Sequence, residues 1–202
     1  MVVRTGEWIS EAWELIKQDF WMHALAALIF SAASSTGIGT FVIGPLLCGY
    51  YFIILQKLRN PGEPLNLNGI GEGLNYFLDA FVASLLIGLF FAIGFFLCFI
   101  PGLVVMGLLF FTYPLIIDRD MGFWEAISES YRVASQNWLG FTIFVLVLGL
   151  ISAGLSLFTL GLGYFVAFPL SEVARALAYR DNFGLKGGHV ARPAPPPPPP
   201  PA

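Results

Sequence analysis

Glu172 and Arg175 are the residues of this sequence best placed to do chemistry. They lie three positions apart near the end of a long apolar run, so on a helix they share a face and can form an ion pair. Charged groups at membrane depth are costly and usually mark a transport site or a proton relay. The alternative is a short final span, from which Arg175 extends its side chain outward to water. The sequence leaves both interpretations open.

The position of Glu172 along its run predicts how deeply it lies. Glu172 comes 11 residues after Gly161. In two earlier runs, the first charges after the corresponding glycines, Gly39 and Gly102, come 18 and 16 residues later. Because a helix rises about 1.5 Å per residue, Glu172 is expected roughly 8–10 Å deeper than its counterparts.

Other candidate residues point less clearly to chemistry. His23 opens a predicted span and could belong to a proton relay, although a histidine at the membrane interface explains it as well. Cys48 and Cys98 both lie in apolar runs, where we expect small packing residues rather than a disulfide. The sequence has none of the common catalytic or phosphate-binding motifs and no cysteine–histidine cluster with metal-ligand spacing. It therefore predicts no enzyme activity, no cofactor and no metal site.

The elements that would position these residues are membrane spans. Residues 80–117 include no Asp, Glu, Lys or Arg over 38 positions, and a bilayer core takes about 20 helical residues per crossing. Two crossings with a tight turn at Pro101 and Gly102 are therefore predicted, since proline lacks an N–H and glycine permits a sharp reversal. The composition agrees, because 57% of residues are apolar and 11% are charged, against about 25% charged in a typical soluble domain.

Two further charge-free runs, residues 20–56 and 133–171, have turns predicted at Gly39 and Gly161. The predicted fold class is therefore all-α, a polytopic membrane protein with six transmembrane helices in three hairpins. An amphipathic segment precedes each hairpin, so we interpret the chain as three parallel repeats. Their approximate bounds are residues 7–60, 70–120 and 122–181, within a single domain of residues 1–185.

The amphipathic segments are predicted to lie at the membrane interface. Residues 7–20 and 123–138 each carry an apolar stripe beside a charged face, and residues 70–81 form a shorter amphipathic piece. In residues 123–138 the stripe consists of Trp124, Ile127, Tyr131, Ala134 and Trp138.

The distribution of positive charge predicts the orientation. All Lys and Arg residues except Arg175 lie in or next to segments on the side of the two termini, whereas the three opposite turns are uncharged. The positive-inside rule then puts both termini and the amphipathic segments in the cytoplasm.

Three prolines occupy corresponding places in the predicted repeats. Pro45, Pro114 and Pro169 each lie within the second helix of a hairpin, where proline removes a backbone hydrogen bond and should kink the helix. Such kinks can line a substrate cavity, but they also simply fit helices around a bundle.

The end of the sequence, residues 186–202, is predicted to be a disordered cytoplasmic tail. Its unbroken prolines at 195–201 favour an extended left-handed helix. Such a helix can dock on aromatic grooves, although a solvated spacer is the more common role.

Several short motifs resemble those of a known bacterial family. The motifs are Ile100-Pro101-Gly102, Tyr113-Pro114-Leu115, and Glu125-Ala126-Ile127 followed by Ser130 and Trp138. Together they are similar to an uncharacterised integral-membrane family related to the membrane domain of glycerophosphoryl diester phosphodiesterases. In those enzymes the catalysis belongs to a separate soluble barrel domain. The resemblance therefore implies a fold and a bacterial inner-membrane location, but no activity.

The sequence favours a non-enzymatic membrane protein of scaffold, assembly or regulatory type. A transporter, channel or lipid-handling protein that uses the region of Glu172 and Arg175 is the alternative, and an intramembrane enzyme is a third possibility. The expected partners are membrane lipids and a protein partner or a second copy of the chain. A net charge of −3 gives no reason to expect nucleic acid.

Overall fold

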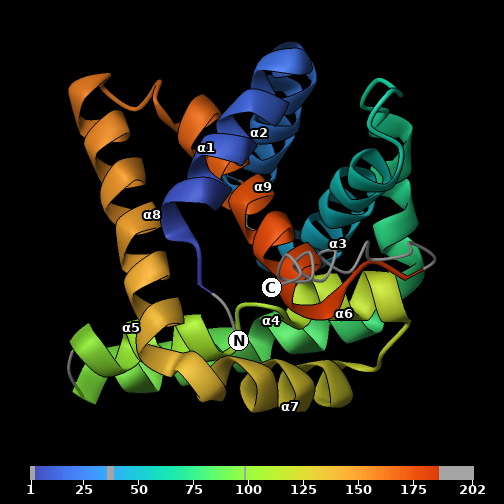
Figure 1. The fold of residues 1–202 in the computed structure, drawn as a ribbon. Helices are drawn as coiled ribbons and strands as arrows, with labels where there is room; N and C mark the ends of the chain where they lie inside the picture. The colour runs from blue at the N-terminus through green and yellow to red at the C-terminus, as the bar shows by residue number, and fades with distance from the viewer. Residues whose placement is uncertain (1–2, 36–38, 98, 187–202) are drawn as a thin grey trace, which may run out of the picture.

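The chain is built from helices, and the computed structural model describes residues 3–35, 39–97 and 99–186 (Figure 1). No strand occurs within these ranges. Among the described residues, four helical stretches are long and apolar enough to cross a membrane: Phe41–Arg59, Leu67–Leu97, Phe99–Arg119 and Phe123–Phe158. The prediction of an all-α fold is confirmed, and these four stretches fit a membrane protein.

The bounds of the helices follow the breaks in the sequence. In chain order they are α1 (Thr5–Gln18), α2 (Phe20–Ser35), α3 (Gly39–Arg59), the 3₁₀ helix η1 (Leu67–Tyr76), α4 (Phe77–Leu97), α5 (Phe99–Leu108), α6 (Thr112–Arg119), α7 (Phe123–Ala134), the 3₁₀ helix η2 (Ser135–Asn137), α8 (Trp138–Phe158) and α9 (Tyr164–Phe183).

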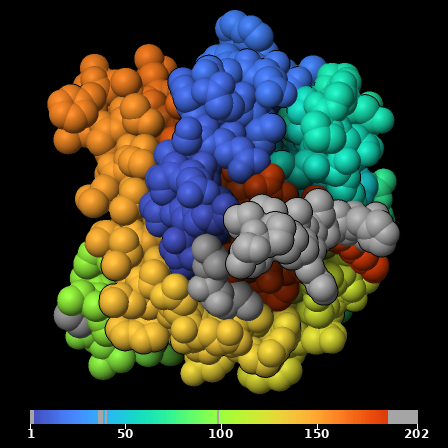
Figure 2. All heavy atoms as spheres, viewed as in Figure 1, coloured from blue at the N-terminus to red at the C-terminus, as the bar shows by residue number. Residues whose placement is uncertain are grey.

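Helix α9 lies at the centre of the fold, in contact with α1, α2, α3 and α8. Its residues Ala174, Ala176 and Ala178 are fully buried, and such small side chains let neighbouring helices approach closely. Trp8 and Ile16 of α1 are also buried, and Figure 2 shows α1, in dark blue, lying against the red α9. The apolar face of this predicted interfacial helix therefore packs on the protein rather than on lipid.

Helices α4, α5 and α7 lie side by side and run crosswise to α8 (Figure 1). The crossing of α5 and α8 is close, because a Cβ added to Gly107 would lie 3.0 Å from the backbone nitrogen of Thr142. Helices α4, α5 and α7 therefore form a layer that crosses α8.

The amphipathic piece predicted at residues 70–81 has a different structure. Its first part belongs to the 3₁₀ helix η1, which packs along α3, and its second part opens α4. Leu74 and Leu78, two apolar residues of this piece, are 57% and 70% exposed. These two leucines therefore do not pack on the protein, whereas Ile70 of the same piece lies against the core.

Glycines make the contact between η1 and α3. A Cβ added to Gly73 would overlap the carbonyl of Pro45, and one added to Gly49 would overlap the carbonyl of Ile70. Backbones can approach this closely only where both helices present small residues. A hydropathy pattern cannot reveal such a contact, because it records only apolar side chains.

The predicted turn at Pro101 and Gly102 is displaced in the structure. Helix α4 continues to Leu97 and α5 begins at Phe99, so both predicted turn residues lie in the first turn of α5. Proline suits this position because the first turn of a helix does not need its N–H groups. Gly102 instead allows close packing, since a Cβ there would lie 3.2 Å from the backbone nitrogen of Phe95.

Pro114 lies beyond a break rather than within a continuous helix. Helix α5 ends at Leu108 and α6 begins at Thr112, so that Pro114 is the third residue of α6. The kink predicted at Pro114 is therefore a full interruption three to five residues earlier. Proline contributes to it because it has no N–H to donate to the carbonyl of Phe110.

The two remaining predicted turn glycines lie at or between helix ends, and the two remaining predicted kink prolines lie inside helices. Gly39 is the first residue of α3, while residues 36–38 lie outside the described residues. Gly161 has a φ of 94° in the turn that joins α8 to α9. Pro45 and Pro169 both lie inside helices, α3 and α9, that continue past them.

Helix α7 buries only part of the predicted stripe. From the stripe, Ile127 and Ala134 are buried, whereas Trp124 and Tyr131 are 61% and 56% exposed. Ala126, Ser130 and Val133, outside the stripe, are also buried. The helix also ends earlier than expected, since residues 135–137 form η2. Smaller side chains pack against α4, α5 and α6, which leaves the large aromatic rings outside.

Candidate functional site

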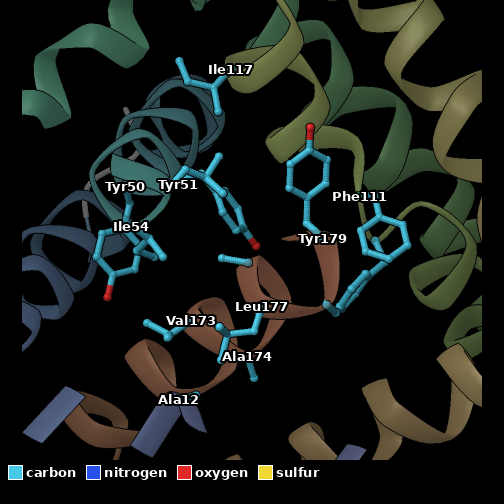
Figure 3. Packing of buried hydrophobic residues seen from close by; sticks show 14 of the residues in the cluster. Ala12, Tyr50, Tyr51, Ile54, Phe111, Ile117, Val173, Ala174, Leu177 and Tyr179 are labelled. Carbon is cyan, nitrogen blue, oxygen red and sulfur yellow. The ribbon is translucent and has the colours of Figure 1, made fainter. Parts of the chain in front are cut away.

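Glu172 and Arg175 form an ion pair on α9, in which Glu172 is buried and Arg175 is partly buried. Nη1 of Arg175 lies 3.2 Å from Oε1 of Glu172, and the two side chains are 22% and 8% exposed. Tyr51 of α3 donates a hydrogen bond from its hydroxyl to the other carboxylate oxygen of Glu172. Figure 3 shows Tyr51 reaching from α3 toward α9. The carboxylate of Glu172 is therefore enclosed between two helices, and the guanidinium group of Arg175 pairs with it while remaining partly exposed.

The guanidinium group of Arg175 also contacts a residue in the break between α5 and α6. It lies over the ring of Phe110, 5.6 Å from the ring centroid, which is a cation–π contact. Its Nε is buried without a hydrogen-bond partner within the described part of the chain. The cluster of Tyr51, Glu172 and Arg175, here called the buried cluster, thus joins α3, α9 and the broken helix.

Ser130 of α7 forms hydrogen bonds with backbone groups at the break between α5 and α6. Its hydroxyl accepts a hydrogen bond from the N–H of Phe111 at 3.0 Å and donates one to the carbonyl of Leu108 at 2.9 Å. Inside an apolar layer, backbone groups freed by a broken helix need such substitutes. Ser130 belongs to the short motif singled out in the sequence, and its neighbour Ala126 is fully buried beside it. The other two motif residues, Glu125 and Trp138, are exposed.

Asp118 is the centre of a second polar cluster, at the end of α6. Its side chain is fully buried, and Arg59 of α3 forms an ion pair with it. The hydroxyl of Tyr179 and the backbone N–H of Lys186 donate to its other oxygen, at 2.8 and 3.1 Å. Asp118 therefore links the end of α6 to the ends of α3 and α9 and to the segment after α9.

The exposed neighbour Asp120 extends this cluster. The side chain of Lys186 and the hydroxyl of Tyr76 both donate hydrogen bonds to its carboxylate. Because the Lys186 hydrogen bond, and then the Tyr76 one, stabilise the charged form, the pKa of Asp120 is lowered from its ordinary value.

The first and last helices meet through charged groups at the same end of the fold. Arg180 of α9 donates two hydrogen bonds to Glu11 of α1, at 2.6 and 3.0 Å. The indole N–H of Trp8 donates to Asp181 at 2.9 Å. These contacts explain why α1 packs on α9, since its polar groups are paired there as well as its apolar ones.

Two further residues named from the sequence have local structural roles. Nδ1 of the buried His23 lies 2.7 Å from the hydroxyl of Tyr50, so α2 and α3 are linked by a hydrogen bond. Cys48 is a buried free thiol, as expected for a packing residue, and Cys98 lies outside the described residues. The predicted tail also lies outside them, apart from Lys186.

Sequence reasoning found the charged pair on α9 but missed its partner Tyr51 and the roles of Asp118 and Ser130. A tyrosine in the middle of an apolar run is a weak signal for a buried polar contact. Within the described ranges, no group of three or more His, Cys, Asp or Glu residues could hold a metal ion. Comparisons with family models, with curated proteins and with solved structures gave no match to this chain.

Proposed function

We propose that the protein is an integral protein of the bacterial inner membrane that moves a proton or another small ion past the buried cluster. The proposal rests on the ion pair of the buried Glu172 and the partly buried Arg175, which lies between α3 and α9 and next to the break between α5 and α6. Ionisable groups inside a membrane bundle are costly to keep and usually serve an ion pathway. Interrupted helices line the binding sites of many transporters.

The proposal includes six spans in three repeats, with both termini in the cytoplasm. Its support is the gathering of charges at one end, where Arg59, Arg180 and Lys186 pair with acidic groups, while Gly161 lies in an uncharged turn. The positive-inside rule assigns the charged end to the cytoplasm. Kinship with the membrane family related to phosphodiesterases is part of the same proposal, and the motif that contains Ser130 supports it.

Labelling of single cysteines tests this orientation. In a background without Cys48 and Cys98, cysteines at Ser35 and Gly161 should react with a membrane-impermeant reagent added outside intact cells. A cysteine at Asn60 should react only after the cells are opened. Outside labelling at Asn60 would reverse the proposed orientation.

Proton movement into reconstituted liposomes tests the proposed activity. A potassium diffusion potential should acidify vesicles that contain the wild-type protein faster than vesicles that contain Glu172→Gln. Glu125→Gln, at an exposed position of α7, is the control and should behave as the wild type. Equal rates for the wild type and empty vesicles would remove proton movement from the proposal.

A scaffold or assembly role is the second candidate, and an apolar groove favours it. The groove lies between α4, α5 and α7, has a volume of about 570 Å³, and is lined by Phe90, Val105 and Trp124 among others. An open apolar surface of this kind suits a partner helix within the membrane. Native mass spectrometry would separate the candidates, because a stoichiometric protein partner supports the scaffold role.

A further inference from the structure

We propose that a phospholipid with a zwitterionic headgroup binds in a cleft between α2, α3 and the segment that follows α3. The cleft has a volume of about 650 Å³, within the range of small-molecule sites. Leu25 of α2 and Ile53 of α3 contribute to an apolar floor, whereas Gln56, Lys57 and Glu63 contribute to a polar rim. This site is separate from the buried cluster.

The cleft lies where the apolar helices α2 and α3 adjoin a polar segment of the chain. Helix α2 begins at Phe20 and α3 ends at Arg59, and the cleft is lined by the first turns of α2 and the last turns of α3. Leu25 is 47% exposed, so the floor is open to an apolar ligand from outside. An amphiphile can therefore lay an acyl chain on the floor and keep its headgroup at the rim.

The charges at the rim select among headgroups. Lys57 can meet a phosphate, but its Nζ already lies 2.8 Å from Oδ2 of Asp19 and 2.7 Å from the carbonyl of Glu63. The carboxylate of Glu63 adds a further negative charge to the rim. A headgroup with only negative charge is therefore disfavoured. A phosphate beside an ammonium matches Lys57 and Glu63 together.

The experiment is native mass spectrometry of the full chain in detergent with defined lipids. Dioleoyl phosphatidylethanolamine and dioleoyl phosphatidylglycerol are added in equal amounts, so that only the headgroup differs. The wild type should retain one phosphatidylethanolamine molecule, with phosphatidylglycerol bound at least tenfold less. Equal retention of the two lipids would overturn the proposal, since it would indicate ordinary lipid at the surface of the helices.

Two variants locate the site. Leu25→Trp fills the floor and should reduce bound phosphatidylethanolamine at least tenfold. Leu28→Trp is the matched control, because Leu28 is 51% exposed on the same helix and does not line the cleft. Equal binding by both variants would overturn the proposal.

A third variant keeps the test decisive if Leu25→Trp fails to fold. Glu63 lies on an exposed segment, so Glu63→Gln should leave the melting temperature unchanged. It should reduce the preference for phosphatidylethanolamine over phosphatidylglycerol at least threefold. An unchanged preference would contradict the assigned role of the rim.

Discussion

Helices α3 and α4 are both long and apolar, but they are held in different ways. In the most apolar part of α3, 50% of the residues are buried inside the protein, against 17% in the stretch that contains α4. Helix α3 touches η1 through glycines and supplies Tyr51 to the buried cluster. Helix α4 instead exposes large rings, with Phe96 95% exposed. Particular contacts position α3, whereas general hydrophobicity suffices for most of α4.

A matched pair of leucine truncations should give the largest difference between these helices. Leu55 of α3 is 1% exposed and Leu85 of α4 is 47% exposed. Leu55→Ala leaves a cavity and should lower the free energy of unfolding by about 2–5 kcal/mol, while Leu85→Ala should change it by less than about 1 kcal/mol. Thermal unfolding in detergent measures both. Similar losses would show that α4 depends on packing as much as α3 does.

Glycine substitutions should distinguish close backbone contact from general packing. Gly49→Ala places a methyl group on the carbonyl of Ile70 and should cost about 1–3 kcal/mol or more. Gly71 in η1 has nothing within 4 Å of an added Cβ, so Gly71→Ala serves as the control and should be tolerated. A stable Gly49→Ala protein would mean that η1 does not pack on α3 as described.

The serine at the helix break should matter more than a serine on the same helix that faces outward. Ser130→Ala leaves the N–H of Phe111 and the carbonyl of Leu108 without this partner and should cost about 1–3 kcal/mol. Ser128→Ala, at an exposed position of α7, should be nearly silent. Equal melting temperatures for the two variants would contradict the role given to Ser130.

The smallest expected effect concerns pH and the exposed cluster around Asp120. A carboxyl group whose pKa is lowered on folding stabilises the protein above its unfolded pKa, and this stabilisation is lost as the pH falls through the folded pKa. Asp120→Asn should therefore cost at most about 1 kcal/mol at pH 7, and the difference from the wild type should shrink below about pH 4. A difference between Asp120→Asn and the wild type that grew toward low pH would contradict the lowered pKa of Asp120.

The helices that end at charged residues could be predicted from the sequence. The bounds of α2 and α3 and the turn at Gly161 lie close to where the charge-free runs and glycines indicated. These features depend on local composition, which sets where a chain can be buried in lipid.

Features that depend on contacts between distant segments could not be predicted. The break before Thr112 requires Ser130 from α7, 18 residues later in the sequence, and the packing of η1 requires facing glycines on α3. At the candidate site, spacing alone brought Glu172 and Arg175 to one face of a helix. Nothing in that spacing pointed to Tyr51, which lies 121 residues before Glu172.

A double-mutant cycle on Glu172 and Arg175 tests the central claim most directly. If the pair is buried as described, Glu172→Gln and Arg175→Met should each cost about 3–5 kcal/mol, because each leaves one partner alone in an apolar site. The double variant should recover much of that loss in thermal unfolding measured in detergent. Small losses of about 0–1 kcal/mol that simply add would mean that both groups reach water, and would contradict the buried cluster.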